Sequence, residues 1–242
     1  MLPNLIVIGA QKCGTTALHE YLDLHPQVAM SRPKELDFFV EQHNWGRGRG
    51  WYERHFAADA PVRGESSPSY TNYPEFRGVA ERAAELVPDA KLVYLVRDPL
   101  DRIVSHYLHN RAQGRGYPMI EAQLGDLRNS VFVAHSLYHV QLRRYLRVFP
   151  ESSILVVDQA DLLADRRGTL GRVFGFLGVA PDFDSPDFDR VHHVSAEKAL
   201  DGRPLPVPRI ESALRRRLVK RLGPDVERLR AQTGMAFETW SL

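Results

Sequence analysis

The chain has 242 residues, and 32 basic against 30 acidic residues give it a formal net charge of +2. This balance does not favour bulk binding to nucleic acid, and a hydrophobic content of 43% is typical of a soluble globular protein. The one cysteine, Cys13, excludes an intrachain disulfide, and no segment has the pattern of a secretion signal or a membrane span. We therefore expect one cytoplasmic domain, residues 1–242, and leave its oligomeric state open.

The first elements expected along the chain are a strand, a glycine-containing loop and a helix. Residues 5–8 form a short apolar run that is typical of a buried parallel strand, and Gly9 ends this run. From Thr16 onward, apolar residues recur at helical spacing until Pro26 ends the pattern.

Strands and helices alternate through most of the remaining chain. Residues 92–96 and 153–158 predict two further strands, each followed by a helix with an apolar stripe. A basic helix is expected from about Pro208, and a second, short helix from Pro224. This alternation predicts an α/β fold with a central parallel sheet flanked by helices. Two loop-rich stretches, at residues 31–73 and 181–208, interrupt the alternation.

The loop after the first strand has the glycine spacing of a phosphate-binding loop. Four residues separate Gly9 from Gly14, and Thr15 and Thr16 follow, but a Walker A motif requires lysine directly after the second glycine. The nearest lysine is Lys12, which precedes Gly14. Backbone N–H groups at the N-terminus of a helix bind anionic oxygens, so the loop is a candidate anion site. Spacing alone leaves open a tight turn that needs its glycines only for their conformation.

Two further segments contain side chains that suit binding or catalysis. Arg97 follows the strand at residues 92–96, and Ser105 lies off the apolar stripe of the next helix, so the two are candidates for a second phosphate. In "RPKELDFF", Lys34 and Glu35 precede two phenylalanines. Burial of the phenylalanines would give Glu35 apolar surroundings, which suit a general base. Taken alone, each segment is better explained by an ordinary ion pair, of Arg97 with Asp98 or Asp101 and of Lys34 with Glu35.

Together and in this order, these segments resemble the PAPS-dependent sulfotransferases, most closely the heparan-sulfate-type branch. The segments that resemble this family are "GAQKCGTTAL", "RPKELDFF", "RGWYERHF", "GESSPSY", "VYLVRDPLDRIVSHY" and "SLYHVQLRRYLRVFP". They span nearly the whole chain, and a tryptophan near the C-terminus also fits. The resemblance implies a P-loop, nucleotide-kinase-like sulfotransferase fold. It also implies transfer of a sulfuryl group from PAPS, which leaves adenosine 3′,5′-bisphosphate.

The resemblance further implies a role for each candidate residue. Lys12 would stabilise charge on the leaving phosphate, Glu35 would take the acceptor proton, and Lys34 would hold the sulfuryl oxygens or the acceptor. No metal ion is required in the family. The remaining residues would bind the nucleotide: Gly14, Thr15 and Thr16 at the 5′-phosphate, Arg97 and Ser105 at the 3′-phosphate, and Lys198 and Arg203 in a late loop that closes over it.

Two departures from the family pattern bear on the acceptor. Asp37 stands where the glycosaminoglycan enzymes often have histidine, and Ser66 stands where they often have lysine. Because both changes remove positive charge, we expect a hydroxyl or amine of a small molecule, glycolipid or carbohydrate rather than a highly sulfated polysaccharide. The alternatives are a P-loop kinase-like phosphotransferase and an inactive nucleotide-binding protein. Other candidates for the base are three histidines: His19, His25 and His106.

Overall fold

The computed structural model describes residues 1–56, 59–116, 119–189 and 205–242. The chain divides into two compact units. The first unit comprises Met1–Val96 and Leu142–His193, and the second comprises Arg97–Gln141 and Val194–Leu242. The expectation that residues 1–242 act as one domain stays a prediction.

The first unit is built on a five-stranded sheet in which every pairing is parallel. The strands lie in the order β2-β3-β1-β4-β5. Their bounds are Leu5–Gly9 for β1, Val28–Met30 for β2, Val62–Ser66 for β3, Lys91–Val96 for β4 and Ile154–Asp158 for β5. The predicted α/β architecture is therefore confirmed, and the three strands expected from apolar runs are β1, β4 and β5.

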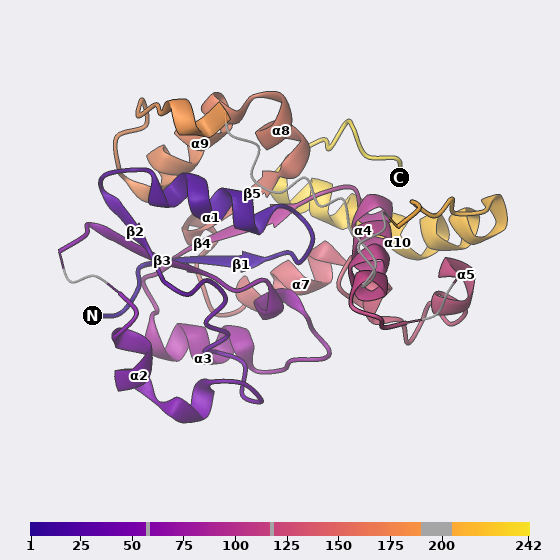
Figure 1. The fold of residues 1–242 in the computed structure, drawn as a ribbon, viewed down its shortest axis with the longest axis horizontal. Coiled ribbons are helices and arrows are strands. Elements are labelled where there is room, and N and C mark those ends of the chain that lie inside the picture. Colours follow the sequence, from indigo (N-terminus) through magenta and orange to yellow (C-terminus); the bar gives the residue numbers. More distant parts are fainter. Residues whose placement is uncertain (57–58, 117–118, 190–204) are drawn as a thin grey trace. The chain divides into compact units, whose positions relative to one another are not determined.

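Helices cover both faces of this sheet. Figure 1 shows α1 and α9 on one side of the sheet and α2 and α3 on the other. Gly178 ends α9, with a φ of 79° in the left-handed region that suits glycine at a helix C-terminus. The helices of this unit are α1 (Thr15–Asp23), α2 (Arg49–Glu53), α3 (Val79–Leu86), α8 (Gln159–Ala164) and α9 (Arg166–Leu177), and its 3-10 turns are η1 (Trp45–Arg47), η2 (Pro68–Thr71), η3 (Glu151–Ser153) and η4 (Pro186–Asp189).

The strand β3 differs in composition from its neighbours. Residues 5–8 of β1 and 92–96 of β4 are apolar and fully buried, as expected for parallel strands covered on both faces. In β3, by contrast, Glu65 and Ser66 are the fully buried side chains. Buried polar groups require hydrogen-bond partners inside the protein, and those partners come from the segments around the candidate site.

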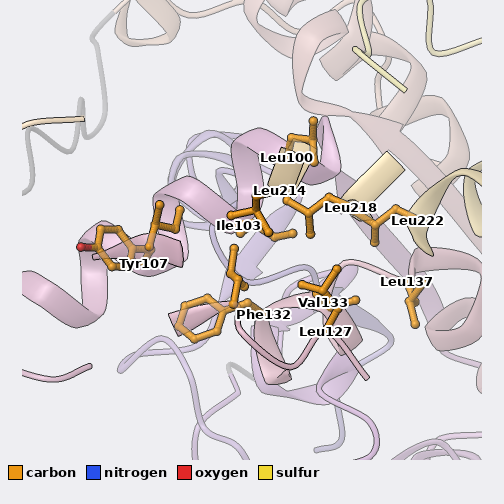
Figure 2. Packing of buried hydrophobic residues seen from close by; sticks show 12 residues of the cluster. Leu100, Ile103, Tyr107, Leu127, Phe132, Val133, Leu137, Leu214, Leu218 and Leu222 are labelled. Atoms are coloured by element: carbon orange, nitrogen blue, oxygen red, sulfur yellow. The ribbon is translucent and has the colours of Figure 1, made fainter. Parts of the chain in front are cut away.

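The second unit is helical. Its helices are α4 (Pro99–Ala112), α5 (Ile120–Gln123), α6 (Val131–Ala134) and α10 (Ser212–Thr233), while α7 (Tyr138–Tyr145) crosses the division between the units. Leu214, Leu218 and Leu222 of α10 belong to one hydrophobic cluster with Leu100 and Ile103 of α4, as Figure 2 shows. This cluster is the core that holds the long basic helix α10 in the unit.

The prediction of a separate helix from Pro224 is wrong, because α10 continues through this residue. Proline removes one backbone donor and usually breaks or kinks a helix. Here Leu222, Val226 and Leu229 are all buried, so the apolar stripe continues on both sides of the proline. Packing of this stripe compensates for the missing hydrogen bond.

Candidate active site

The loop between β1 and α1 presents the N-terminus of α1. Gly14 is the N-cap residue, and no side chain of the described residues caps this end of the helix. The N–H of Ala10 donates to the carbonyl of Leu95 at 2.6 Å, which ties the loop to β4. The first N–H groups of a helix, here including those of Thr15 and Thr16, have no acceptor within the helix. This is the arrangement that binds anionic oxygens.

Two residues of the loop have left-handed backbone conformations. Lys12 has a φ of 70° and Gly14 a φ of 93°. A Cβ atom on Gly14 would lie 2.9 Å from Nε2 of Gln159. The turn therefore needs glycine at position 14 for its conformation, as the simpler interpretation of the spacing expected. Lys12 is not glycine, and such strained residues cluster at ligand-binding and catalytic sites.

The Lys34–Glu35 segment is attached to the C-terminal end of β3. The N–H of Glu35 donates to the carbonyl of Ser66 at 3.0 Å, and the N–H of Asp37 donates to Oγ of Ser67 at 3.0 Å. The Glu35 side chain is 53% exposed and forms an ion pair with Nζ of Lys34, whose side chain is 16% exposed. The backbone of Glu35 is thus fixed while its carboxylate reaches solvent, which is what a base that meets a diffusing acceptor requires.

The apolar surroundings expected for Glu35 are not found. Phe38 and Phe39 are buried and anchor the segment, as predicted, and the Phe38 ring stacks on Tyr52 with a centroid separation of 4.1 Å. This burial does not extend to Glu35, because its half-exposed carboxylate is solvated and paired with Lys34. The ion pair considered from the sequence is therefore present.

His19 of α1 connects the helix of the phosphate-type loop to the strand that holds the Lys34–Glu35 segment. Its Nδ1 lies 3.0 Å from Oγ of Ser66, and both residues are buried. Burial, together with the positive charge of Lys34, lowers the pKa of His19 to about 4, so the imidazole is neutral at pH 7. Through Ser66, the end of β3 contacts both α1 and Glu35.

The other two histidines considered as bases have structural partners. Nε2 of His25 lies 3.1 Å from the carbonyl oxygen of Ala180. His106 is a buried residue of the second unit, and its ring packs on Phe132 with a centroid separation of 4.2 Å. The histidine of α1 is itself buried. Glu35 is thus the most accessible of these four candidates.

The two positions that depart from the family pattern have different environments. Ser66 is fully buried and hydrogen-bonded to the α1 histidine. Asp37 accepts a hydrogen bond from the Ser69 hydroxyl at Oδ1, and its Oδ2 lies 3.3 Å from Nδ1 of His43. Burial raises the pKa of Asp37, and the hydrogen bond from Ser69 and the charge of His43 oppose that shift. Position 66 therefore supplies a buried hydroxyl group, and position 37 supplies a partly buried carboxyl group. The pattern of the glycosaminoglycan enzymes has cationic side chains at these two positions.

Glu65 is a fully buried acidic residue of this region that was not identified from the sequence. Its carboxylate accepts hydrogen bonds from the hydroxyls of Tyr52, Ser67 and Tyr70. Burial raises the pKa of Glu65 to about 7, although all three donors oppose the shift. The sequence contains one indication of this role, which is a glutamate within a strand of a parallel sheet. Such a residue requires hydrogen-bond partners when it is buried.

Arg97 and Ser105 belong to the second unit. Nη2 of Arg97 lies 3.6 Å from Oδ2 of Asp101, so the surface ion pair considered from the sequence is present, with the Asp101 side chain 67% exposed. Ser105 is half-buried on α4. Binding of a 3′-phosphate by these two residues stays a prediction. Lys198 and Arg203 lie outside the described residues.

The described residues contain no group of three or more His, Cys, Asp or Glu side chains arranged to hold a metal ion. Among the helices of that same part of the chain, none combines the length and the apolar character needed to cross a membrane.

Comparison with known proteins identifies the family. A family model described as a sulfotransferase domain matches residues 2–205. This chain belongs to the sulfotransferase-domain family. The resemblance inferred from the sequence motifs is thereby confirmed, and the chain is a sulfotransferase domain, the transferase class predicted.

The curated relatives of this sulfotransferase domain include two human proteins. It is 32% identical over 202 residues to bifunctional heparan sulfate N-deacetylase/N-sulfotransferase 2, a match that covers 74% of this chain and 22% of that protein. It is also 32% identical over 257 residues to heparan sulfate glucosamine 3-O-sulfotransferase 6, covering 97% of this chain and 73% of the relative. The chain thus spans about a fifth of the length of the bifunctional relatives it matches.

Solved structures confirm the predicted sulfotransferase fold. A sulfotransferase from Alicyclobacillus acidocaldarius superimposes with a TM-score of 0.81 at 28% identity, and the match covers 100% of both chains. The mouse sulfotransferase SULT7A1, solved in complex with PAP, superimposes with a TM-score of 0.60 at 15% identity, over 96% of this chain and 88% of that one. The second likeness concerns the fold alone.

Proposed function

We propose that this chain transfers the sulfuryl group of PAPS to a hydroxyl or amine of a small-molecule, glycolipid or carbohydrate acceptor. The acceptor atom bonds to sulfur as the bond from sulfur to the phosphate oxygen breaks, and adenosine 3′,5′-bisphosphate leaves. Membership of the sulfotransferase-domain family supports sulfuryl transfer. The single observation that carries the proposal is the arrangement around Ser66, which contacts both α1, the helix that follows the phosphate-type loop, and Glu35.

The loop provides the groups proposed to receive the leaving phosphate. Negative charge grows on the oxygen that bridges phosphorus and sulfur as the bond from sulfur to this oxygen breaks. A preorganised cation beside the oxygen therefore stabilises the transition state more than the ground state. We assign this role to Lys12. The N–H groups of Gly14, Thr15 and Thr16, at the start of α1, are proposed to bind the 5′-phosphate. This assignment explains why the lysine comes before the second glycine rather than after it.

Glu35 is proposed as the general base. Its carboxylate is accessible and its backbone is hydrogen-bonded to β3, so it combines reach with a fixed position. It would accept the proton of the attacking hydroxyl or amine. Lys34, which pairs with Glu35 in this structure, would hold the sulfuryl oxygens or the acceptor.

The remaining nucleotide contacts are proposed from the sequence motifs. Arg97 and Ser105 would bind the 3′-phosphate, the group that distinguishes PAPS from ordinary nucleotides, and a forked arginine contact suits a phosphate. Lys198 and Arg203 would close over the nucleotide. These four assignments depend on the family pattern.

The proposed acceptor class follows from the residues at two positions. Ser66 is buried, and Asp37 contributes a carboxyl group, so neither supplies a cation for a highly sulfated chain. A carbohydrate remains in the proposed class because two relatives are named for heparan sulfate. A hydroxyl or amine with little negative charge nearby fits both observations.

The experiment that tests this function compares two ligands and then measures transfer. A ligand that binds the native state raises stability by about 2.7 kcal/mol at a concentration of one hundred times its Kd. We expect adenosine 3′,5′-bisphosphate to raise the melting temperature and labelled sulfate to pass from PAPS to members of a hydroxyl and amine panel. Stabilisation by ATP–Mg²⁺ alone would instead indicate a kinase-like phosphotransferase. Bisphosphate binding without any transfer would indicate a nucleotide-binding protein.

A further inference from the structure

Three hydroxyl groups from different elements converge on the buried Glu65 carboxylate. Oε1 accepts hydrogen bonds from the Tyr52 hydroxyl of α2 and from the Tyr70 hydroxyl of η2, the latter at 2.8 Å. Oε2 accepts a hydrogen bond from the Ser67 hydroxyl at 2.7 Å. Glu65 itself is 0% exposed. Both carboxylate oxygens are therefore engaged by hydroxyl groups inside the protein.

The same three residues also contact the segment that follows Glu35. Oγ of Ser67 accepts the N–H of Asp37 at 3.0 Å, and the hydroxyl oxygen of Tyr70 accepts the N–H of Phe39 at 3.3 Å. The Tyr52 ring stacks on Phe38, with an interplanar angle of 8°. Residues 37–39 are thus each contacted by one of the three residues that donate to Glu65.

The direction of these hydrogen bonds depends on Glu65. A hydroxyl has one proton to donate, and at Ser67 and Tyr70 that proton goes to the carboxylate. Each oxygen is then left with lone pairs, which accept the backbone N–H groups of Asp37 and Phe39. A protonated carboxyl group or a carboxamide at position 65 has a hydrogen-bond donor where the carboxylate has only acceptors. At least one of the three hydroxyl groups would then have to direct its proton elsewhere.

The segment needs such support because its backbone is strained. Glu35 and Asp37 have φ values of 63° and 46°, in the left-handed region that non-glycine residues rarely adopt. Strained conformations persist only where the surrounding contacts over-determine them. The contacts at Asp37 and Phe39, together with the bond from the Glu35 N–H to Ser66, are among those that fix this stretch. Further hydrogen bonds come from the Ser69 hydroxyl to Asp37, from Nδ2 of Asn44 to the carbonyl of Leu36, and from Nε of Arg82 to the carbonyl of Phe39.

We propose that Glu65 is a positioning residue: its buried carboxylate orients Ser67, Tyr52 and Tyr70 so that they hold residues 37–39 and thereby keep the nearby Glu35 in its reactive position. This inference rests on the proposed function only in assigning the proton transfer to Glu35. The support that Glu65 gives to the segment is a property of this chain that can be measured without a substrate.

Several titratable groups face the Glu65 carboxylate. Tyr52 and Tyr70 touch it directly, and Asp37 acts on it through its charge. Burial raises the pKa of Tyr145 on α7, and the charges of Glu81 and Glu65 raise it further. Burial raises the pKa of both tyrosines that touch it well above the usual value. Within a pH range around neutrality, Glu65 therefore changes charge while these tyrosines keep their protons.

The test measures hydrogen exchange of the full chain in the variant Glu65→Gln, which keeps the shape of the side chain and replaces one acceptor by a donor. We expect the amides of Asp37 and Phe39 to lose protection while residues 5–8 of β1 keep theirs. In the sulfuryl-transfer assay, kcat should fall by roughly 10–100-fold, the cost of a displaced catalytic group. Affinity for adenosine 3′,5′-bisphosphate should stay within about twofold, a change of about 0.4 kcal/mol. The wild-type kcat should fall as the pH drops through about 7 and Glu65 takes up a proton, and this dependence should be absent in Glu65→Gln.

Two further variants keep the proposal falsifiable if Glu65→Gln folds poorly. Tyr70→Phe removes one hydroxyl of the network and should also deprotect Phe39. Its matched control is Tyr145→Phe, which removes a buried hydroxyl that donates to the carbonyl of Tyr70 at 2.8 Å rather than to Glu65. The control should leave that segment protected.

The inference and the proposed function fail in different ways. Wild-type exchange protection at Asp37 and Phe39 in both Glu65→Gln and Tyr70→Phe would overturn the positioning role, whatever the activity. A drop in kcat without any change in exchange at residues 35–39 would also overturn it. A wild-type chain that transfers no sulfuryl group to any acceptor would remove the proposed function, and the exchange measurement would still decide whether Glu65 fixes the segment.

Discussion

Replacing Gly14 by alanine tests whether the loop before α1 needs glycine for its backbone conformation. Gly14 has φ 93° and ψ 18°, in the left-handed region. A residue with a Cβ atom is destabilised by about 1–2 kcal/mol in that region. The new Cβ atom would lie 2.9 Å from Nε2 of Gln159, which is the flexible end of a side chain and can move aside. We therefore expect the free energy of unfolding to fall by about 1–2 kcal/mol, mainly from the conformation.

A second glycine separates the possible causes of this loss. Gly234 has a φ of 69°, and apart from its chain neighbours no atom would lie within 4 Å of a Cβ atom added there, so Gly234→Ala should incur the conformational cost alone. In a Gln159→Ala background, Gly14→Ala should lower the free energy of unfolding by nearly as much as it does in the wild type.

Urea denaturation of each variant measures these differences, and a loss of 1–2 kcal/mol corresponds to about 2–8 °C in melting temperature. A Gly14→Ala variant as stable as the wild type would refute the conformational argument. No loss in the Gln159→Ala background would show that the contact with Gln159, not the backbone, is responsible. If the loop binds the 5′-phosphate, Gly14→Ala should also reduce the stabilisation by adenosine 3′,5′-bisphosphate, whereas Gly234→Ala should not.

Three further predictions concern individual charged residues. Glu35→Gln should lower turnover by about 10²–10⁴-fold, because it removes the proposed base. The free energy of unfolding should change by less than about 0.5 kcal/mol, because the Glu35 side chain is 53% exposed. The transfer assay checks the loss of turnover, with Glu41→Gln as an exposed control, and equal losses in both variants would contradict the prediction. Arg97→Ala should weaken binding of adenosine 3′,5′-bisphosphate by about 1.5–3 kcal/mol, measured by calorimetry. Asp101→Asn, which removes the ion-pair partner of Arg97, should leave the affinity unchanged. Unaltered affinity in Arg97→Ala would exclude Arg97 from the site. Burial raises the pKa of Glu65 from 4.5 to about 7. The folded chain therefore keeps a proton that the unfolded chain releases, and the free energy of unfolding should fall by about 3 kcal/mol as the pH rises from 4.5 to 7. Urea titrations in which Glu65→Gln shows the same pH dependence as the wild type would rule this out.

The parts of the fold that sequence predicts well are those with strong hydrophobic patterns. The apolar runs at residues 5–8 and 92–96 predict β1 and β4 because strands covered on both faces need continuous apolar residues. The strand β2 has three residues, too few for periodicity to indicate it. In β3, Glu65 and Ser66 hide the strand from any hydrophobic pattern, and their partners come from segments distant in the sequence. Only the resemblance of "GESSPSY" to a strand and loop of the family indicated that strand.

In the candidate site too, some features could be predicted from the sequence and others could not. The motifs identified Lys12, Lys34 and Glu35 because each lies within a short, distinctive segment. The accessibility of Glu35 was not predictable, because it depends on where the following phenylalanines pack relative to the turn. The contact between His19 and Ser66 joins residues 47 positions apart, so only the folded chain shows it.

The order of the strands has a consequence for synthesis on the ribosome. The segment that becomes β1 emerges before the other strands, but it pairs with β3 at Gly64 and with β4 at Lys91. At about 5–20 residues per second, a nascent chain waits roughly 5–20 s before both neighbours have been made. During that interval the apolar segment at residues 5–8 lacks at least one of its two neighbouring strands. Chaperones that bind extended hydrophobic peptides should therefore recognise this segment on translating ribosomes and release it once the segment around Lys91 emerges.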